Sequence, residues 1–195
     1  MHFFTDRFTG VDEKKLQKRV GQRKLIFMNQ IHSANIVVVD KNSPEIILKT
    51  DSMITMDRDI ALGARAADCI PVVFEDKEKG AVGVAHAGRV GSYMGIVKKT
   101  IQKMVDEFGC EEKDIRVTLG PSIKKCCYEV GVEVIEGFEE FTSEKDGKIY
   151  LDLIALNTKG VKNMEVVPTC TCCDDNYFSY RRDGTKERFC GVVYV

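Results

Sequence analysis

The stretch ARAADCIPVVFEDKEKGAVGVAHAGRVGS, residues 64–92, predicts a β-hairpin with a chemically reactive residue at each end. Its first expected strand, Ile70–Glu75, is apolar and rich in β-branched residues, and its second, Ala81–Ala85, contains small and branched residues. A polar turn over Asp76–Lys79, closed by Gly80, separates the two strands.

This turn predicts which residues of the hairpin face each other. A loop over 76–79 pairs Glu75 with Gly80, and the same register places Cys69 opposite His86. Directly opposed side chains have Cβ atoms roughly 5 Å apart, which is close enough to share one metal ion or one proton. We therefore expect a thiol and an imidazole to meet at the open end of the hairpin.

Length and composition predict one globular domain over residues 1–195, because 44% of the residues are hydrophobic and 30% are charged. The net charge of −1 and the lack of a large basic block argue against a nucleic-acid binder. No apolar run reaches membrane-spanning length and the N-terminus lacks the pattern of a signal peptide, so no membrane partner and a cytoplasmic location are expected.

Short strand patterns, helix patterns and hairpins alternate along the chain. This predicts an α+β fold, with mixed β-sheets flanked by helices, rather than a doubly wound parallel sheet. Apolar residues recur at helical spacing over 91–108, where Ser92 can cap the start and Gly109 the end. A second helix is expected over 132–141, followed by a polar turn at 143–147.

The chain has three histidines, and His32 lies in an expected turn between two strands. His32, Cys69 and His86 together offer two imidazoles and one thiolate, which are zinc-type ligands. Three protein ligands leave the fourth tetrahedral position open, as in catalytic zinc sites. The same residues also permit a reaction without metal, with Cys69 as the nucleophile and His86 as its base.

Eight cysteines is a high number for a cytoplasmic protein. Cys170 and Cys173 form a C-x-x-C pair, and together with Cys126 and Cys127 they could form either a structural zinc site or disulfides. Further along, aromatic residues precede two arginines in YFSYRRDG, residues 177–184, a combination that suits a ring-bearing anionic ligand.

Seven motifs occur in one order from about Met28 to the end of the chain: NQIHS (29–33), DSMIT (51–55), ADCIPVV (67–73), AVGVAHAG (81–88), LGPSIKKCCYEVG (119–131), DLIALN (152–157) and CTCCDDNYFSYRRDG (170–184). As an ordered set they resemble the bacterial family long labelled polyphenol oxidase (laccase domain). Members of that family are now described as purine nucleoside phosphorylases with adenosine deaminase activity.

The resemblance implies a compact α+β fold and a zinc ion held by His32, Cys69 and His86. It also implies phosphorolysis of adenosine, inosine, guanosine and methylthioadenosine to the base and sugar 1-phosphate, with adenosine deamination as a second activity. The family usually reads H-A-G-W-R-G where this chain reads HAGRVG, residues 86–91, so the aromatic residue is missing and the arginine comes one place earlier. Arg89, Arg181 and Arg182 are the candidates for holding the anionic substrate.

Three alternatives remain open at this point. One is a metal-independent, amidase-type cysteine hydrolase that uses Cys69 and His86. Another is a copper-dependent polyphenol oxidase, although three histidines are few for a multicopper cluster. The third is a non-enzymatic interaction or redox protein built on the C-terminal cysteines. The expected partners of the preferred enzyme are purine nucleosides and phosphate, and the oligomeric state stays open.

Overall fold

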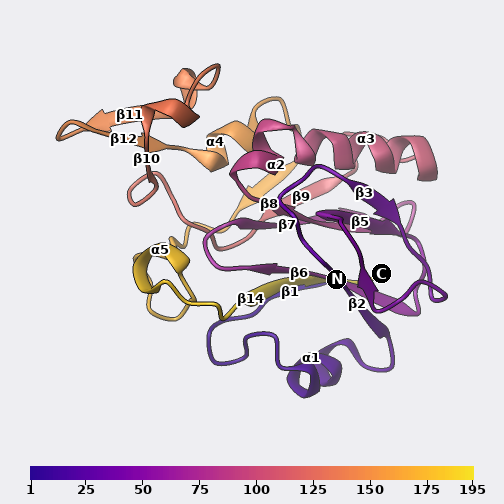
Figure 1. Ribbon diagram of the computed structural model, residues 1–195. Helices are drawn as coiled ribbons and strands as arrows, with labels where there is room; N and C mark the ends of the chain where they lie inside the picture. Colours follow the sequence, from indigo (N-terminus) through magenta and orange to yellow (C-terminus); the bar gives the residue numbers. More distant parts are fainter.

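Two stacked β-sheets with helices on both outer faces form the body of the protein (Figure 1). The computed structural model describes residues 1–195. The strands are β1 (His2–Phe4), β2 (Lys24–Met28), β3 (Ile36–Val38), β4 (Ile46–Ile47), β5 (Ser52–Thr55), β6 (Ile60–Ala66), β7 (Ile70–Asp76), β8 (Ala81–Ala87), β9 (Arg116–Leu119), β10 (Glu129–Val130), β11 (Thr142–Lys145), β12 (Lys148–Leu151), β13 (Met164–Val166) and β14 (Phe189–Val193). The helices are α1 (Glu13–Val20), α2 (Arg89–Tyr93), α3 (Ile96–Phe108), α4 (Leu153–Thr158) and α5 (Tyr180–Asp183).

The five-stranded sheet has the order β1-β14-β6-β2-β4, and the six-stranded sheet has the order β13-β9-β7-β8-β5-β3. Both contain parallel and antiparallel pairs, which confirms the predicted α+β class with mixed sheets. A small third sheet, β10-β12-β11, lies beside α4 (Figure 1). No helix has the length and apolar character needed to cross a membrane. The assignment of one domain to residues 1–195 stays a prediction.

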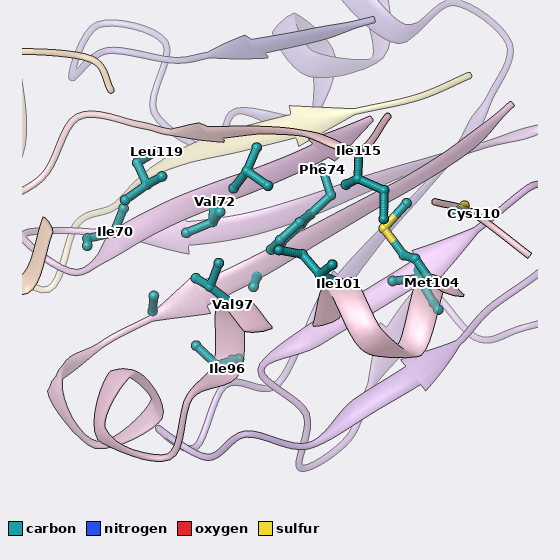
Figure 2. Packing of buried hydrophobic residues seen from close by; sticks show 14 of the residues in the cluster. Ile70, Val72, Phe74, Ile96, Val97, Ile101, Met104, Cys110, Ile115 and Leu119 are labelled. Atoms are coloured by element: carbon teal, nitrogen blue, oxygen red, sulfur yellow. The ribbon is translucent and has the colours of Figure 1, made fainter. Parts of the chain in front are cut away.

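The largest core lies between the six-stranded sheet and α3. Val97, Ile101 and Met104 project from α3 onto Val72 and Phe74 of β7 (Figure 2). This confirms the predicted amphipathic stripe. The single helix expected over 91–108 is divided, however, because the backbone turns into the left-handed region at the glycine of position 95, with φ of 75°.

A second core fills the space between the two sheets, and it determines where the reactive residues lie. Along β8, Val82 and Val84 contact this core, and His86 continues the same face because side chains alternate with period two. On β7, Val73 faces the same core. At the end of β8, the core between the two sheets is therefore bordered by the imidazole of His86.

The predicted register of the hairpin was wrong by two residues. Asp76 pairs with Ala81 and Pro71 pairs with His86, so the turn lies at 77–80 and includes Gly80, whose φ is 65°. Continued one pair further, this register aligns Cys69 with Gly88 rather than with His86. A displacement of two residues keeps a side chain on the same face of a strand, so Cys69 and His86 remain diagonal neighbours.

The helix expected over 132–141 does not form. The segment contains two 3₁₀ turns, Val132–Val134 and Glu139–Phe141, separated by Gly137 in the left-handed region with φ of 79°. Neither turn has a buried residue, so there is no covered face on which an amphipathic helix could pack. The expected turn at 143–147 is partly strand, because Thr142–Lys145 forms β11 of the small sheet.

An ion pair joins β1, an edge strand of the five-stranded sheet, to β7 inside the six-stranded sheet. His2 of β1 places its Nδ1 2.7 Å from Oε2 of Glu75 on β7. Burial raises the pKa of the Glu75 carboxyl, but His2 and the N-terminal amino group outweigh burial and lower it from 4.5 to about 2. Since the folded pKa lies below the ordinary value, this contribution to stability is complete above the ordinary value and is lost as the pH falls toward 2.

We expect Glu75→Gln to lower the free energy of unfolding by about 1–3 kcal/mol at pH 7, with the difference from wild type vanishing as the pH falls toward 2. Urea denaturation at a series of pH values measures this. Glu165→Gln, which removes an exposed partner of Arg116, is the control and should change the free energy by less than about 1 kcal/mol. A destabilisation by Glu75→Gln that is the same at pH 7 and pH 2 would contradict the assignment.

Candidate metal centre

His32, Cys69 and His86 meet at one end of the inter-sheet space. They come from the loop after β2, from the residue before β7 and from β8, and their ligand atoms all lie within 4.8 Å of one another. The two imidazole rings lie edge to face, with centroids 4.9 Å apart. His86 is buried, Cys69 is half-buried and His32 is exposed, so the group is reachable from one side. The structure thus brings together the three residues that the sequence singled out.

The carboxylate of Asp51, just before β5, organises this group. Its side chain is buried, and Oδ1 lies 2.9 Å from Nδ1 of His86. It also accepts the backbone N–H groups of Ile31, His32 and Ser33 at 2.8–3.1 Å, and the Ser33 hydroxyl at 2.8 Å. Burial raises the pKa of the Asp51 carboxyl, but these donors hold it well below its ordinary value.

These contacts prepare the donor atoms for a metal. Because Nδ1–H of His86 donates a hydrogen bond to the ionised Asp51 carboxylate, the other ring nitrogen, Nε2, is the one left to bind an ion, as in carboxylate–histidine–zinc arrangements. Burial raises the pKa of the Cys69 thiol, but the charge of His86 and the hydrogen bond of His32 lower it to about 6. Burial lowers the pKa of His86, but Cys69 and Asp51 raise it to about 9. Without a metal, these shifts favour a Cys69 thiolate beside a protonated His86, and an ion that binds Nε2 would replace the second ring proton.

Gly88 supports the same interpretation by its lack of a side chain. A Cβ at this position would lie 2.9 Å from Cδ2 of His32 and 3.1 Å from Sγ of Cys69. The backbone of Gly88 has φ of −77°, which any residue can adopt, so the absence of a side chain matters for space and not for conformation. The donor set and this close approach both fit a metal ion held by His32, Cys69 and His86.

The three residues form part of the wall of a cavity of about 590 Å³. This volume lies within the range of small-molecule sites in proteins. Arg65, Arg181 and Arg188 line the cavity together with Tyr128 and Tyr180. The cavity therefore combines a site for one metal ion, several positive charges and two aromatic rings.

Arg181 is the one predicted anion-binding arginine that lines the cavity. Its backbone N–H donates to Oδ2 of Asp68 at 2.7 Å, and its guanidinium donates to the carbonyl of Glu129 at 2.9 Å. The guanidinium carbon also lies 5.3 Å from the centre of the Tyr128 ring. These contacts hold Arg181 beside an aromatic face.

Arg182 and Arg89 are placed elsewhere. The guanidinium of Arg182 donates to the carbonyls of Thr171 and Tyr177, both at 2.9 Å, so its role in the structure is to join backbone segments. Arg89 begins α2, and its guanidinium lies 5.8 Å from the centre of the Tyr93 ring. Neither lines the cavity.

The sequence reasoning missed Asp51, Arg65 and Arg188. The backbone of Arg65 is held in place by Gln30 of the motif NQIHS. The side-chain amide of Gln30 donates to the carbonyl of Arg65 and accepts its N–H, each at 2.9 Å. This amide continues the pairing of β2 with β6 beyond the last paired residues. Asp51 is the first residue of the motif DSMIT and directly precedes a buried strand. A charged residue at such a position is the one feature of the sequence that could have pointed to Asp51.

Comparisons with known proteins assign the chain to a family. Residues 2–195 match the family described as multi-copper polyphenol oxidoreductase laccase, and the chain belongs to that family. A purine nucleoside phosphorylase of Aquifex aeolicus is 36% identical over 187 residues, covering 93% of this chain and 87% of the relative. A purine nucleoside phosphorylase of Clostridium acetobutylicum is 38% identical over 169 residues, covering 81% and 71%. The predicted resemblance is thereby confirmed.

Solved structures have the same fold. The hypothetical protein YfiH of Bacillus licheniformis superposes with a TM-score of 0.89 at 24% identity, covering 98% of this chain and 91% of that one. YlmD of Geobacillus stearothermophilus gives a TM-score of 0.84 at 27% identity, covering 92% and 77%.

We expect Asp51→Asn to weaken zinc binding ~10–100-fold, because the amide cannot hold His86 and the loop over 31–33 as a carboxylate does. Loss of these bonds should also reduce the free energy of unfolding by about 2–4 kcal/mol. Competition with a chelator and urea denaturation measure the two effects. Asp57→Asn is a matched control, since Asp57 accepts backbone N–H groups of Lys41 and Asp59 but contacts no histidine. An unchanged zinc affinity in Asp51→Asn would contradict this role.

Gly88→Ala should weaken zinc binding at least ~10-fold, because the new methyl group displaces the side chains of His32 and Cys69. The metal-free variant can relax these two side chains, so its urea midpoint should stay close to that of the metal-free wild type. Isothermal titration with zinc and urea denaturation in chelator separate the two quantities. Wild-type zinc affinity in this variant would show that the close approach of Gly88 is unimportant.

Proposed function

We propose that the protein is a zinc-dependent purine nucleoside phosphorylase with adenosine deaminase as a second activity, acting in the cytoplasm. The observation that carries the proposal is the convergence of His32, Cys69 and His86 in the wall of a cavity that also carries arginines and tyrosines. The names of the relatives from Aquifex aeolicus and Clostridium acetobutylicum support the choice of purine nucleosides as substrates.

The lining of the cavity suits the two parts of a nucleoside and its co-substrate. Guanidinium groups bind phosphate through paired, charge-assisted hydrogen bonds, and Arg65, Arg181 and Arg188 line the cavity. The rings of Tyr128 and Tyr180 offer flat faces on which a purine can stack. A zinc ion on the three ligands, when bound, supplies a Lewis acid and a water of lowered pKa at its fourth position.

In phosphorolysis, an oxygen of phosphate forms a bond to C1′ of the ribose while the bond from C1′ to the purine nitrogen breaks. That nitrogen keeps the electron pair and takes up a proton, which gives the free base and sugar 1-phosphate. The arginines hold the phosphate against C1′ and balance its charge, and the tyrosines keep the purine in place. Positioning of the two reactants in this way lowers the entropic part of the barrier.

Adenosine deamination requires the same purine to be held near water. A water oxygen adds to the carbon that bears the amino group, and the amino group leaves as ammonia. Asp68 is the acidic residue in the lining, but its oxygens accept hydrogen bonds from the Thr171 hydroxyl and the Arg181 N–H, both at 2.7 Å. Asp68 therefore positions Arg181 within the cavity wall.

The decisive experiment is metal analysis of purified protein, combined with assays of nucleosides with and without phosphate. Wild-type protein should release base only when phosphate is present. Cys69→Ala should lose the ion at this site and at least ~100-fold of its activity, because both transition states lose their main electrostatic support. Cys190→Ala is a control at a buried cysteine outside the site. Full activity in a folded Cys69→Ala variant would refute the proposal.

The cysteine hydrolase remains a second candidate because the lowered pKa of Cys69 and the raised pKa of His86 also describe a thiolate–imidazolium pair. A chelator separates the two enzymes. The zinc enzyme loses its activity on removal of the metal, whereas the thiol enzyme keeps it. Oxygen uptake with a phenol after copper loading tests the oxidase that the family description suggests.

A further inference from the structure

Half of the cysteines of the chain gather at one place outside the proposed nucleoside site. Cys126 and Cys127 lie in the loop between β9 and β10, and Cys170 and Cys173 lie between β13 and α5 (Figure 1). Their four sulfur atoms all lie within 4.8 Å of one another, and none of the four belongs to the group around Cys69. We refer to these residues as the cysteine quartet.

The spacing of the sulfur atoms matches tetrahedral coordination. Sγ of Cys126 lies 3.7 Å from that of Cys127, 3.6 Å from that of Cys170 and 3.8 Å from that of Cys173. Cys127 and Cys173 are 3.2 Å apart. Zinc–sulfur bonds of about 2.3 Å in a regular tetrahedron place the sulfurs roughly 3.8 Å apart. An ion fits among the four sulfurs with small shifts of the side chains.

The backbone around the quartet is arranged as in metal-binding turns. In the C-x-x-C pair, the N–H groups of Cys173 and Asp174 donate to the carbonyl of Cys170 at 3.1 and 3.0 Å, which directs both sulfurs to one side. The N–H of Lys124 donates to Sγ of Cys170 at 3.5 Å, a bond that supports a thiolate ligand. Cys127 closes its own turn by donating its N–H to the carbonyl of Lys124 at 3.0 Å.

We propose that Cys126, Cys127, Cys170 and Cys173 bind a structural zinc ion. Four thiolates and no open position define a closed site, in contrast to the three-ligand group around Cys69. The complex has a net charge of about −2, and Arg181 and Arg182 lie next to it. Their guanidinium groups reach the carbonyls of Cys127 and Cys172 at 3.4 and 3.5 Å. The inference does not rest on the proposed nucleoside chemistry.

The position of the quartet indicates what this zinc ion does. Its two segments run side by side, joined by a single parallel bridge between Ser122 and Cys170. The segments carry Ile123, Tyr128 and Arg181, which line the cavity. Ile123 belongs to none of the three core clusters and Tyr128 only borders the largest one. An ion that ties the two segments together would therefore fix the ring and the guanidinium relative to each other.

Metal content of the full-length protein, purified under reducing conditions, tests the inference. We expect two zinc ions per wild-type chain, one in Cys173→Ser and one in Cys69→Ala. Cys172→Ser is the matched control, since this neighbouring cysteine lies outside the quartet, and it should keep two ions. Cobalt loading should give the ligand-field and sulfur charge-transfer bands of a tetrahedral thiolate site in wild type and in Cys69→Ala, but not in Cys173→Ser.

Mapping of thiol alkylation on the wild-type protein gives a test that needs no variant. Zinc should protect the four quartet cysteines, and removal of zinc by a chelator should expose them and lower the melting temperature of Cys69→Ala. The inference is overturned if Cys173→Ser holds as much zinc as wild type. It is equally overturned if the quartet cysteines of the reduced, zinc-treated protein are alkylated as fast as after chelation, or if they are found as disulfides or as ligands of an iron–sulfur cluster.

Discussion

The buried carboxylate of Asp51 is the group on which the arrangement of His32, Cys69 and His86 depends. A charged carboxylate is stable in a protein interior only where donors surround it. Here the donors are the backbone of residues 31–33, the Ser33 hydroxyl and the ring of His86. The same bonds hold His32 in its unusual backbone conformation, with φ of 59°, and select the nitrogen that His86 presents to the cavity. The Asp51 carboxylate thus fixes both the conformation of the loop over 31–33 and the tautomer of His86.

The stacking of the two sheets decides where this group can act. Side chains along β7 and β8 point alternately into the helix-covered core and into the core between the sheets. Cys69 and His86 lie on the face that points between the sheets, at the end of that core. The remaining walls of the cavity come from Met28, Arg65 and Ala66 on β2 and β6, and from segments beyond the sheets. The segments beyond the sheets carry Tyr128 and Arg181; both segments are hydrogen-bonded to Asp68, and they meet at the cysteine quartet.

The description of the family and the names of the relatives point to different chemistries, and the donor set bears on the choice. The chain offers two imidazoles at the site, because the third, His2, is paired with Glu75 of β7. One thiolate, two imidazoles and an open side describe a site for a single ion with room for substrate. The arginines in the same cavity fit phosphate, which a phenol oxidase does not require.

The sequence by itself determined the class of the fold, the amphipathic stripe within the helix expected over 91–108, and the three residues that converge at the candidate metal centre. Periodicity, turn chemistry and residue type are local properties, and an error of two residues in the hairpin register left Cys69 and His86 on one face. Only the tertiary structure decided that Asp51 reaches His86, that Arg65 lines the cavity in place of Arg182, and that the cysteine quartet comes together. Each of these depends on contacts between residues far apart in the chain, which pair only when the sheets stack and the loops between strands close over their ends.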